Sequence, residues 1–217
     1  MRLPCPRTAR VAVLAVLGGA TLFGACASAG PPRPLTPAQL AIRDGGIPPY
    51  TKADVEFMQG MIGHHAQAVT MSSFAEPNGA SSEVRVLAGR IAVAQTDEMD
   101  FMEDWLRTRK QTVPPRDGAH HHHAGMDMSG ASGQMPGMLS PAQMDTLARA
   151  RGPAFDWYFL TYMSQHHRGA ITMVDALMQA RSAANDDNVF KFVSDVVADQ
   201  STEIARMELL LKTRPKP

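Results

Sequence analysis

Residues 54–71 read DVEFMQGMIGHHAQAVTM and residues 156–173 read DWYFLTYMSQHHRGAITM, so one pattern occurs twice, 102 residues apart. Both copies contain Asp-x-x-Phe-x-x-x-Met-x-x-His-His, followed by Ala, Thr and Met at matching positions. Their apolar residues recur at intervals of three and four, which is the period of an amphipathic helix. The sequence therefore predicts a duplicated helical unit.

A second repeat follows each copy of the first. Residues 95–106 (QTDEMDFMEDWL) match residues 200–211 (QSTEIARMELLL) at an offset of 105. Since no stretch alternates with period two for long enough to form a sheet, the pattern predicts an all-α fold. Two helical hairpins, each with one apolar stripe, bury those stripes against each other as a four-helix bundle. The predicted long helices are 52–75, 82–110, 153–181 and 187–212.

Short polar and proline-containing segments divide the rest of the chain. Thr36-Pro37 and Ser140-Pro141 each resemble a helix N-cap followed by proline in the first turn. The predicted parts are a signal peptide (1–29), a lead-in with a short helix (30–50), a first hairpin (51–110), a His/Met-rich linker (111–139) and a second hairpin (140–217). The linker has too little apolar bulk to pack, and we expect it to be mobile.

The first 29 residues have the layout of an export signal. A positive start is followed by a short apolar run and small residues. Two cleavage interpretations remain open. The segment Leu22–Cys26 resembles a lipobox, which would leave Cys26 as a lipidated membrane anchor, whereas Ala27-Ser28-Ala29 would release a soluble protein. Either predicts a location in the cell envelope, periplasmic or membrane-anchored.

Charge and cysteine usage exclude several function classes. Removing the leader leaves 18 basic against 21 acidic residues, so the mature chain has a net charge of −3 and no basic excess for nucleic acid. Both cysteines, Cys5 and Cys26, lie in the leader region. The folded part is therefore predicted to contain neither a disulfide nor a cysteine metal site.

Polar residues fall on the faces that should be buried. Helical spacing places both histidine pairs inward, and it places a Gln and a Glu in core positions on each partner helix. Because an unpaired buried carboxylate costs several kcal/mol, each Glu should bond a histidine. That pairing is either purely structural, or it orients imidazoles that bind a metal. The second-shell candidates are Gln95, Glu98, Gln200 and Glu203.

Methionine and histidine are distributed as metal donors. Of 15 methionines, 14 lie beyond Met1, and all eight histidines occur in three clusters. The linker is not expected to be core, yet it is enriched in the same two donors, which favours metal binding over a merely solvated polar tract. The predicted metal ligands are Met61, His64, His65, Met71, Met163, His166, His167 and Met173, with His120, His121, His122, His123, Met126 and Met128 in the linker.

The donor set favours copper. Thioether with imidazole suits Cu(I), and imidazole alone also accepts Cu(II). A thioether needs no deprotonation and cannot be lost to a disulfide outside the cytoplasm. Zinc sites lack such a methionine excess, and the Glu-x-x-His spacing of a di-iron bundle is absent. Silver should occupy the same sites.

At these residues the sequence resembles the domain of unknown function 305 family. The shared pattern is Phe-x-x-x-Met-x-x-His-His, a following Met, and then Gln-x-x-Glu-x-x-x-Met on the next helix, over about residues 50–107 and 140–211. The resemblance implies a ferritin-like four-helix bundle. Some relatives are envelope copper-binding proteins linked to copper tolerance. The His/Met linker is not part of the family pattern.

The leading functional hypothesis is an envelope protein that sequesters, stores or carries copper. Its bundle would hold the metal, while the linker would capture it or pass it to partner copper proteins. Because there is no nucleophile arrangement, phosphate loop or HExxH motif, we expect no enzymatic activity. The alternatives are a metal-free helical interaction module and, third, a metal-dependent oxidase.

Overall fold

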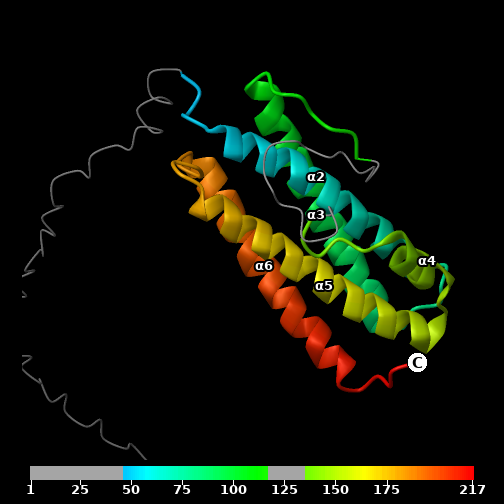
Figure 1. The fold of residues 1–217 in the computed structure, drawn as a ribbon. Coiled ribbons are helices and arrows are strands. Elements are labelled where there is room, and N and C mark those ends of the chain that lie inside the picture. Colours follow the sequence, from blue (N-terminus) through cyan, green and yellow to red (C-terminus); the bar gives the residue numbers. More distant parts are fainter. Residues whose placement is uncertain (1–45, 117–134) are drawn as a thin grey trace, which may run out of the picture. The chain divides into compact units, whose positions relative to one another are not determined.

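The computed structural model describes residues 46–116 and 135–217, which form five helices and no strand (Figure 1). The helices are α2 (Lys52–Ser73), α3 (Ser82–Thr108), α4 (Pro141–Arg149), α5 (Gly152–Gln179) and α6 (Asp187–Leu211). The four long helices begin and end within one turn of their predicted bounds, and the all-α four-helix-bundle prediction is confirmed. The predicted signal peptide, most of the lead-in and most of the linker lie outside the described residues.

Local sequence signals set the helix starts. Thr51 and Asp54 form a capping box at the start of α2. Ser140 and Gln143 form another at α4, with Pro141 in the first turn, as the sequence predicted. In both boxes the two side chains satisfy backbone N–H groups that have no partner within the helix. None of the helices in residues 46–116 and 135–217 is long and apolar enough to cross a membrane.

Two equivalent aspartates tie the two hairpins together. α2 packs with α3, α5 packs with α6, and α2 and α5 pack against each other. Asp54 accepts a hydrogen bond from the backbone N–H of Ala184, at 2.7 Å, in the loop before α6. Its counterpart Asp156 accepts one from Ser81, at 3.0 Å, in the loop before α3. Each repeat therefore holds the loop of the other, so the bundle is one cooperative unit.

The core consists of two apolar clusters that mix the repeats. The first contains Met61 of α2 together with Met173 of α5, and the second contains Met71 of α2 together with Met163 of α5. All four side chains are fully buried. Each predicted methionine ligand therefore lies in a cluster with a methionine from the other repeat. Met178 of α5, by contrast, is 47% exposed.

Both ends of the predicted linker pack against the bundle, which corrects the expectation that all of it is mobile. Leu139 is buried, and its backbone N–H and C=O both bond the side chain of Gln67. Met138 is also buried. At the other end, Arg116 bonds Glu103 and Asp100. Composition missed these contacts because they use backbone groups and single side chains rather than an apolar stripe.

Candidate metal centre

Four histidines lie in the middle of the bundle, two on α2 and two on α5. His64, His65, His166 and His167 are all fully buried, so the prediction that both pairs point inward is confirmed. The rings of His64 and His166 are in contact, with centroids 3.8 Å apart. The two repeats thus meet at their equivalent histidines.

The hydrogen-bond partner of each imidazole fixes which nitrogen carries the proton. His64 Nε2 lies 3.0 Å from the Pro136 carbonyl, and His166 Nε2 lies 3.0 Å from the His64 carbonyl. A carbonyl oxygen can only accept, so both Nε2 atoms must be protonated. His65 and His167 pair in the same way, because their Nε2 atoms lie 2.6 Å from carboxylate oxygens of neighbouring helices.

This arrangement leaves four ring nitrogens without a partner. The Nδ1 atoms of all four histidines are buried and make no hydrogen bond within the described part of the chain. A buried polar atom without a partner costs about 1–3 kcal/mol, so four in one place require an explanation. Imidazole usually binds a metal in its neutral form. One ring nitrogen is then the ligand, while the other donates a hydrogen bond to a nearby acceptor.

Burial keeps the central histidines neutral. Desolvation, with a smaller contribution from the neighbouring His65, lowers the pKa of His64 from 6.5 to about 3. Desolvation and the proximity of His64 likewise hold the pKa of His166 well below its usual value. Since a metal competes with protons for the same lone pair, a low pKa keeps these nitrogens free at neutral pH.

Buried thioether sulfur lies on the same helices as these imidazoles. Among the described residues, no three His, Cys, Asp or Glu side chains are grouped so that they could hold a metal ion. On α2, Met61 precedes the histidine pair and Met71 follows it. On α5, Met163 precedes the pair and Met173 follows it. All four are buried in the two core clusters, Met61 with Met173 and Met71 with Met163. The available donor set is therefore imidazole nitrogen and thioether sulfur, which selects soft ions.

The Gln and Glu residues that were predicted to support the histidines fall into two kinds. Glu98 bonds His65 and Glu203 bonds His167, as expected, but their side chains are 17% and 20% exposed rather than fully in the core. Gln95 and Gln200 are buried at 2% exposure, and neither amide has a hydrogen-bond partner in the described part. The glutamates thus connect the buried histidines with solvent.

Sequence reasoning missed the residues that cover His64. Pro136 supplies the carbonyl that accepts from His64, and the neighbouring Met135 lies against α2, its sulfur 3.4 Å from the point where a Cβ on Gly60 would stand. Gly169 makes this approach possible, because a Cβ there would lie 2.0 Å from the Pro136 oxygen. A glycine two residues after the His166-His167 pair was the available signal. His120–His123, Met126 and Met128 lie outside the described residues.

Together these features define a helical bundle with a buried histidine and methionine centre made from two repeats. The chain belongs to the family described as Domain of unknown function (DUF305), whose model matches residues 54–211. No curated protein matches the chain by sequence.

Several solved structures resemble the chain. A DUF305 protein from Streptomyces coelicolor is 29% identical with a TM-score of 0.62, covering 76% of this chain and 94% of that chain. A DUF305 fragment from Deinococcus radiodurans is 31% identical with a TM-score of 0.62, covering 76% and 99%. CopM in its Cu(II)-bound form is 26% identical with a TM-score of 0.56, covering 73% and 95%. CopM has also been solved with Cu(I), with silver and without metal.

Proposed function

We propose that this protein is an exported copper-binding protein that sequesters or carries Cu(I) through the buried histidines and methionines, without catalysing a reaction. The observation that carries the proposal is the set of four buried, unpartnered Nδ1 atoms, each on an imidazole whose other nitrogen is already bonded. The binding of copper and silver by CopM, a protein of the same fold, supports it.

The chemistry of the donors favours Cu(I) over Cu(II). Thioether sulfur is soft, and the methionines that could join the histidines are fully buried in apolar clusters. Cu(II) prefers imidazole and oxygen, so its binding would depend on the histidines and on Glu98 and Glu203. The envelope location rests on the leader pattern in residues 1–29, and lipid anchoring at Cys26 remains a prediction.

The proposal is tested by competition for Cu(I) between the mature protein and a chromogenic chelator under anaerobic conditions. The His64→Leu/His166→Leu variant keeps the site apolar but removes two lone pairs, and we expect its affinity to fall at least about tenfold, or about 1.4 kcal/mol. Met61→Leu should also weaken binding. Met58→Leu is the matched control, because Met58 is equally buried in the same cluster but one turn further from the histidines.

The linker needs its own arm in this experiment. A variant with His120–His123 replaced by alanine should bind fewer copper ions in total while keeping the tightest one. If the double histidine variant competes as well as the wild type once the linker histidines are gone, the bundle holds no copper and the proposal is wrong.

A further inference from the structure

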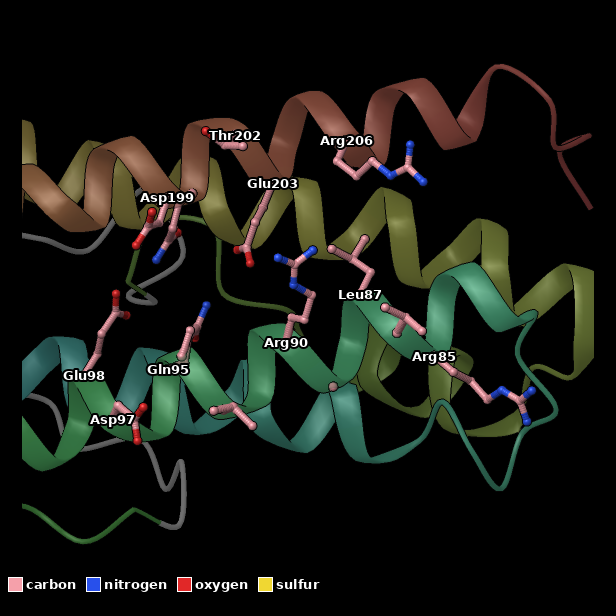
Figure 2. A pocket seen from close by; sticks show the side chains of 15 residues that line it. Arg85, Leu87, Arg90, Gln95, Asp97, Glu98, Asp199, Thr202, Glu203 and Arg206 are labelled. Atoms are coloured by element: carbon pink, nitrogen blue, oxygen red, sulfur yellow. The ribbon is translucent and has the colours of Figure 1, made fainter. Parts of the chain in front are cut away.

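A groove runs along the bundle between α3 and α6, on the side where the glutamates of the histidine pairs emerge. It has a volume of about 930 Å³ and is lined by α3 from Arg85 to Glu98 and by α6 from Asp199 to Arg206. Figure 2 shows Glu98, Asp199 and Glu203 pointing into it from both walls. Its lining includes the two partly exposed carboxylates that bond the buried His65 and His167.

The groove occupies one half of a duplicated structure. Where its lining ends at Glu98 and Asp199, the rings of Phe101 on α3 and Phe192 on α6 stack with centroids 4.7 Å apart. At the offset of 105 that relates the two repeats, Phe192 corresponds to Leu87 and Phe101 corresponds to Arg206. In the half that contains the groove, the aromatic pair is thus replaced by Leu87, which is smaller, and Arg206, which is charged.

The inner end of the groove suits a cation. Three carboxylates gather there, and burial together with the charges of Glu98 and Glu203 raises the pKa of Asp199. Gln95 and Gln200 line the same end, 2% exposed and with both amide atoms free of partners in the described residues. Carboxylates gathered at one place attract a cation, and they gather at this end, whereas Arg85, Arg90 and Arg206 line the rest of the groove. The unpartnered amides add oxygen atoms that can replace part of the cation's water shell.

Beside His64, away from the lining of the groove, the backbone is tightly packed. There the Pro136 carbonyl bonds His64, and the backbone of Pro136 and Gly137 lies directly on Gly169. A Cβ on Gly137 would meet backbone atoms of α5 at 2.7 Å, so this contact leaves no space for an ion.

We propose that the groove between α3 and α6 is the port through which the metal ion passes between solvent and the buried histidines, with Glu98 and Glu203 as the groups that receive it. This inference rests on the proposed copper function. The groove sets the rate at which the ion enters and leaves, whereas the buried histidines and methionines set the affinity.

The test closes the port by restoring the missing aromatic pair. In Leu87→Phe/Arg206→Phe, the equilibrium affinity for Cu(I) should stay within about twofold, because no proposed ligand changes. Release of Cu(I) to an excess of chromogenic chelator should slow at least about tenfold, a barrier increase of about 1.4 kcal/mol. Loading should slow by the same factor, since the ratio of the two rates sets the affinity.

Two further variants serve as controls. Leu209→Phe/Arg149→Phe makes the same kinds of substitution at exposed positions outside the groove lining and should leave both rates unchanged. Phe101→Arg/Phe192→Leu places the residue types of the open half at the equivalent positions of the closed half, and it should speed release of Cu(I). Circular dichroism checks the fold of each variant. If the closed variant does not fold, the opened variant decides.

The outcomes separate this inference from the proposed function. If wild-type protein holds Cu(I) but the closed variant releases it at the wild-type rate, the metal uses another route and the port is wrong. If release slows only because affinity rises, with loading unchanged, the groove acts on the bound state and the port is equally wrong. If wild-type protein binds no Cu(I), the proposed function fails and the port fails with it.

Discussion

Acid should destabilise this bundle through its central histidines, at pH values where carboxylates remain ionised. His64 takes up a proton at pH 6.5 when unfolded but only near pH 3 when folded, and His166 is shifted in the same direction. Between those values the unfolded chain binds more protons than the folded one. Stability is therefore complete above pH 6.5 and is lost as the pH falls.

The size of the loss follows from the distance below pH 6.5. At pH 5 a histidine that stays neutral in the fold contributes about 2 kcal/mol of destabilisation, since each pH unit corresponds to 1.36 kcal/mol. For His64 we expect a loss of about 2 kcal/mol between pH 7.5 and pH 5, and His166, whose pKa is lowered in the same direction, adds to it. This is a large fraction of the 5–15 kcal/mol typical of a domain.

The assay is the free energy of unfolding in guanidinium chloride, followed by far-ultraviolet circular dichroism across this pH range without metal. The control is His64→Leu/His166→Leu, which removes both titrating groups and should flatten the pH dependence. Equal stability of the wild type at pH 7.5 and pH 5 would refute the reasoning. So would a double variant that retains the wild-type slope, because the proton uptake would then belong to other groups.

Two further predictions concern backbone contacts. Gly169→Ala should destabilise the protein by about 1–3 kcal/mol, because its Cβ would overlap the Pro136 oxygen. Gly89→Ala, a helical position with nothing within 4 Å of the added carbon, should instead stabilise by about 0.5–1 kcal/mol. The melting temperatures of the two variants, compared with that of the wild type, measure both effects. Asp54→Ala should cost about 1–3 kcal/mol, because it leaves the buried N–H of Ala184 without an acceptor. An unchanged melting temperature in that variant would mean that water replaces the carboxylate.

Much of the fold and part of the centre could be predicted from the sequence, because the relevant signals are periodic and occur twice. The spacing of Met61, His64 and Phe57 along one helical face predicts burial, and all three are fully buried. The pairing of Glu98 and Glu203 each with one histidine followed from the cost of burying a lone carboxylate. These are local patterns and general energies, and they need no knowledge of tertiary contacts.

The remainder depended on contacts between distant segments. Helical spacing treats His64 and His65 alike, yet in the structure one bonds a linker carbonyl and the other a carboxylate on α3. The seating of Pro136 on Gly169 is a backbone contact, which carries no side-chain pattern. Likewise, Leu87 and Arg206 look unremarkable until the offset between repeats shows which aromatic residues they replace.

The contact between His64 and His166 places the centre where the two repeats are equivalent. A single hairpin of this kind could make the same contact with a second copy of itself, as a symmetric homodimer does. In such a dimer, any substitution would appear on both sides at once. When the two copies are joined in one chain, each can change independently. One half can therefore keep the stacked rings of Phe101 and Phe192 while the other half has different residues at the equivalent positions.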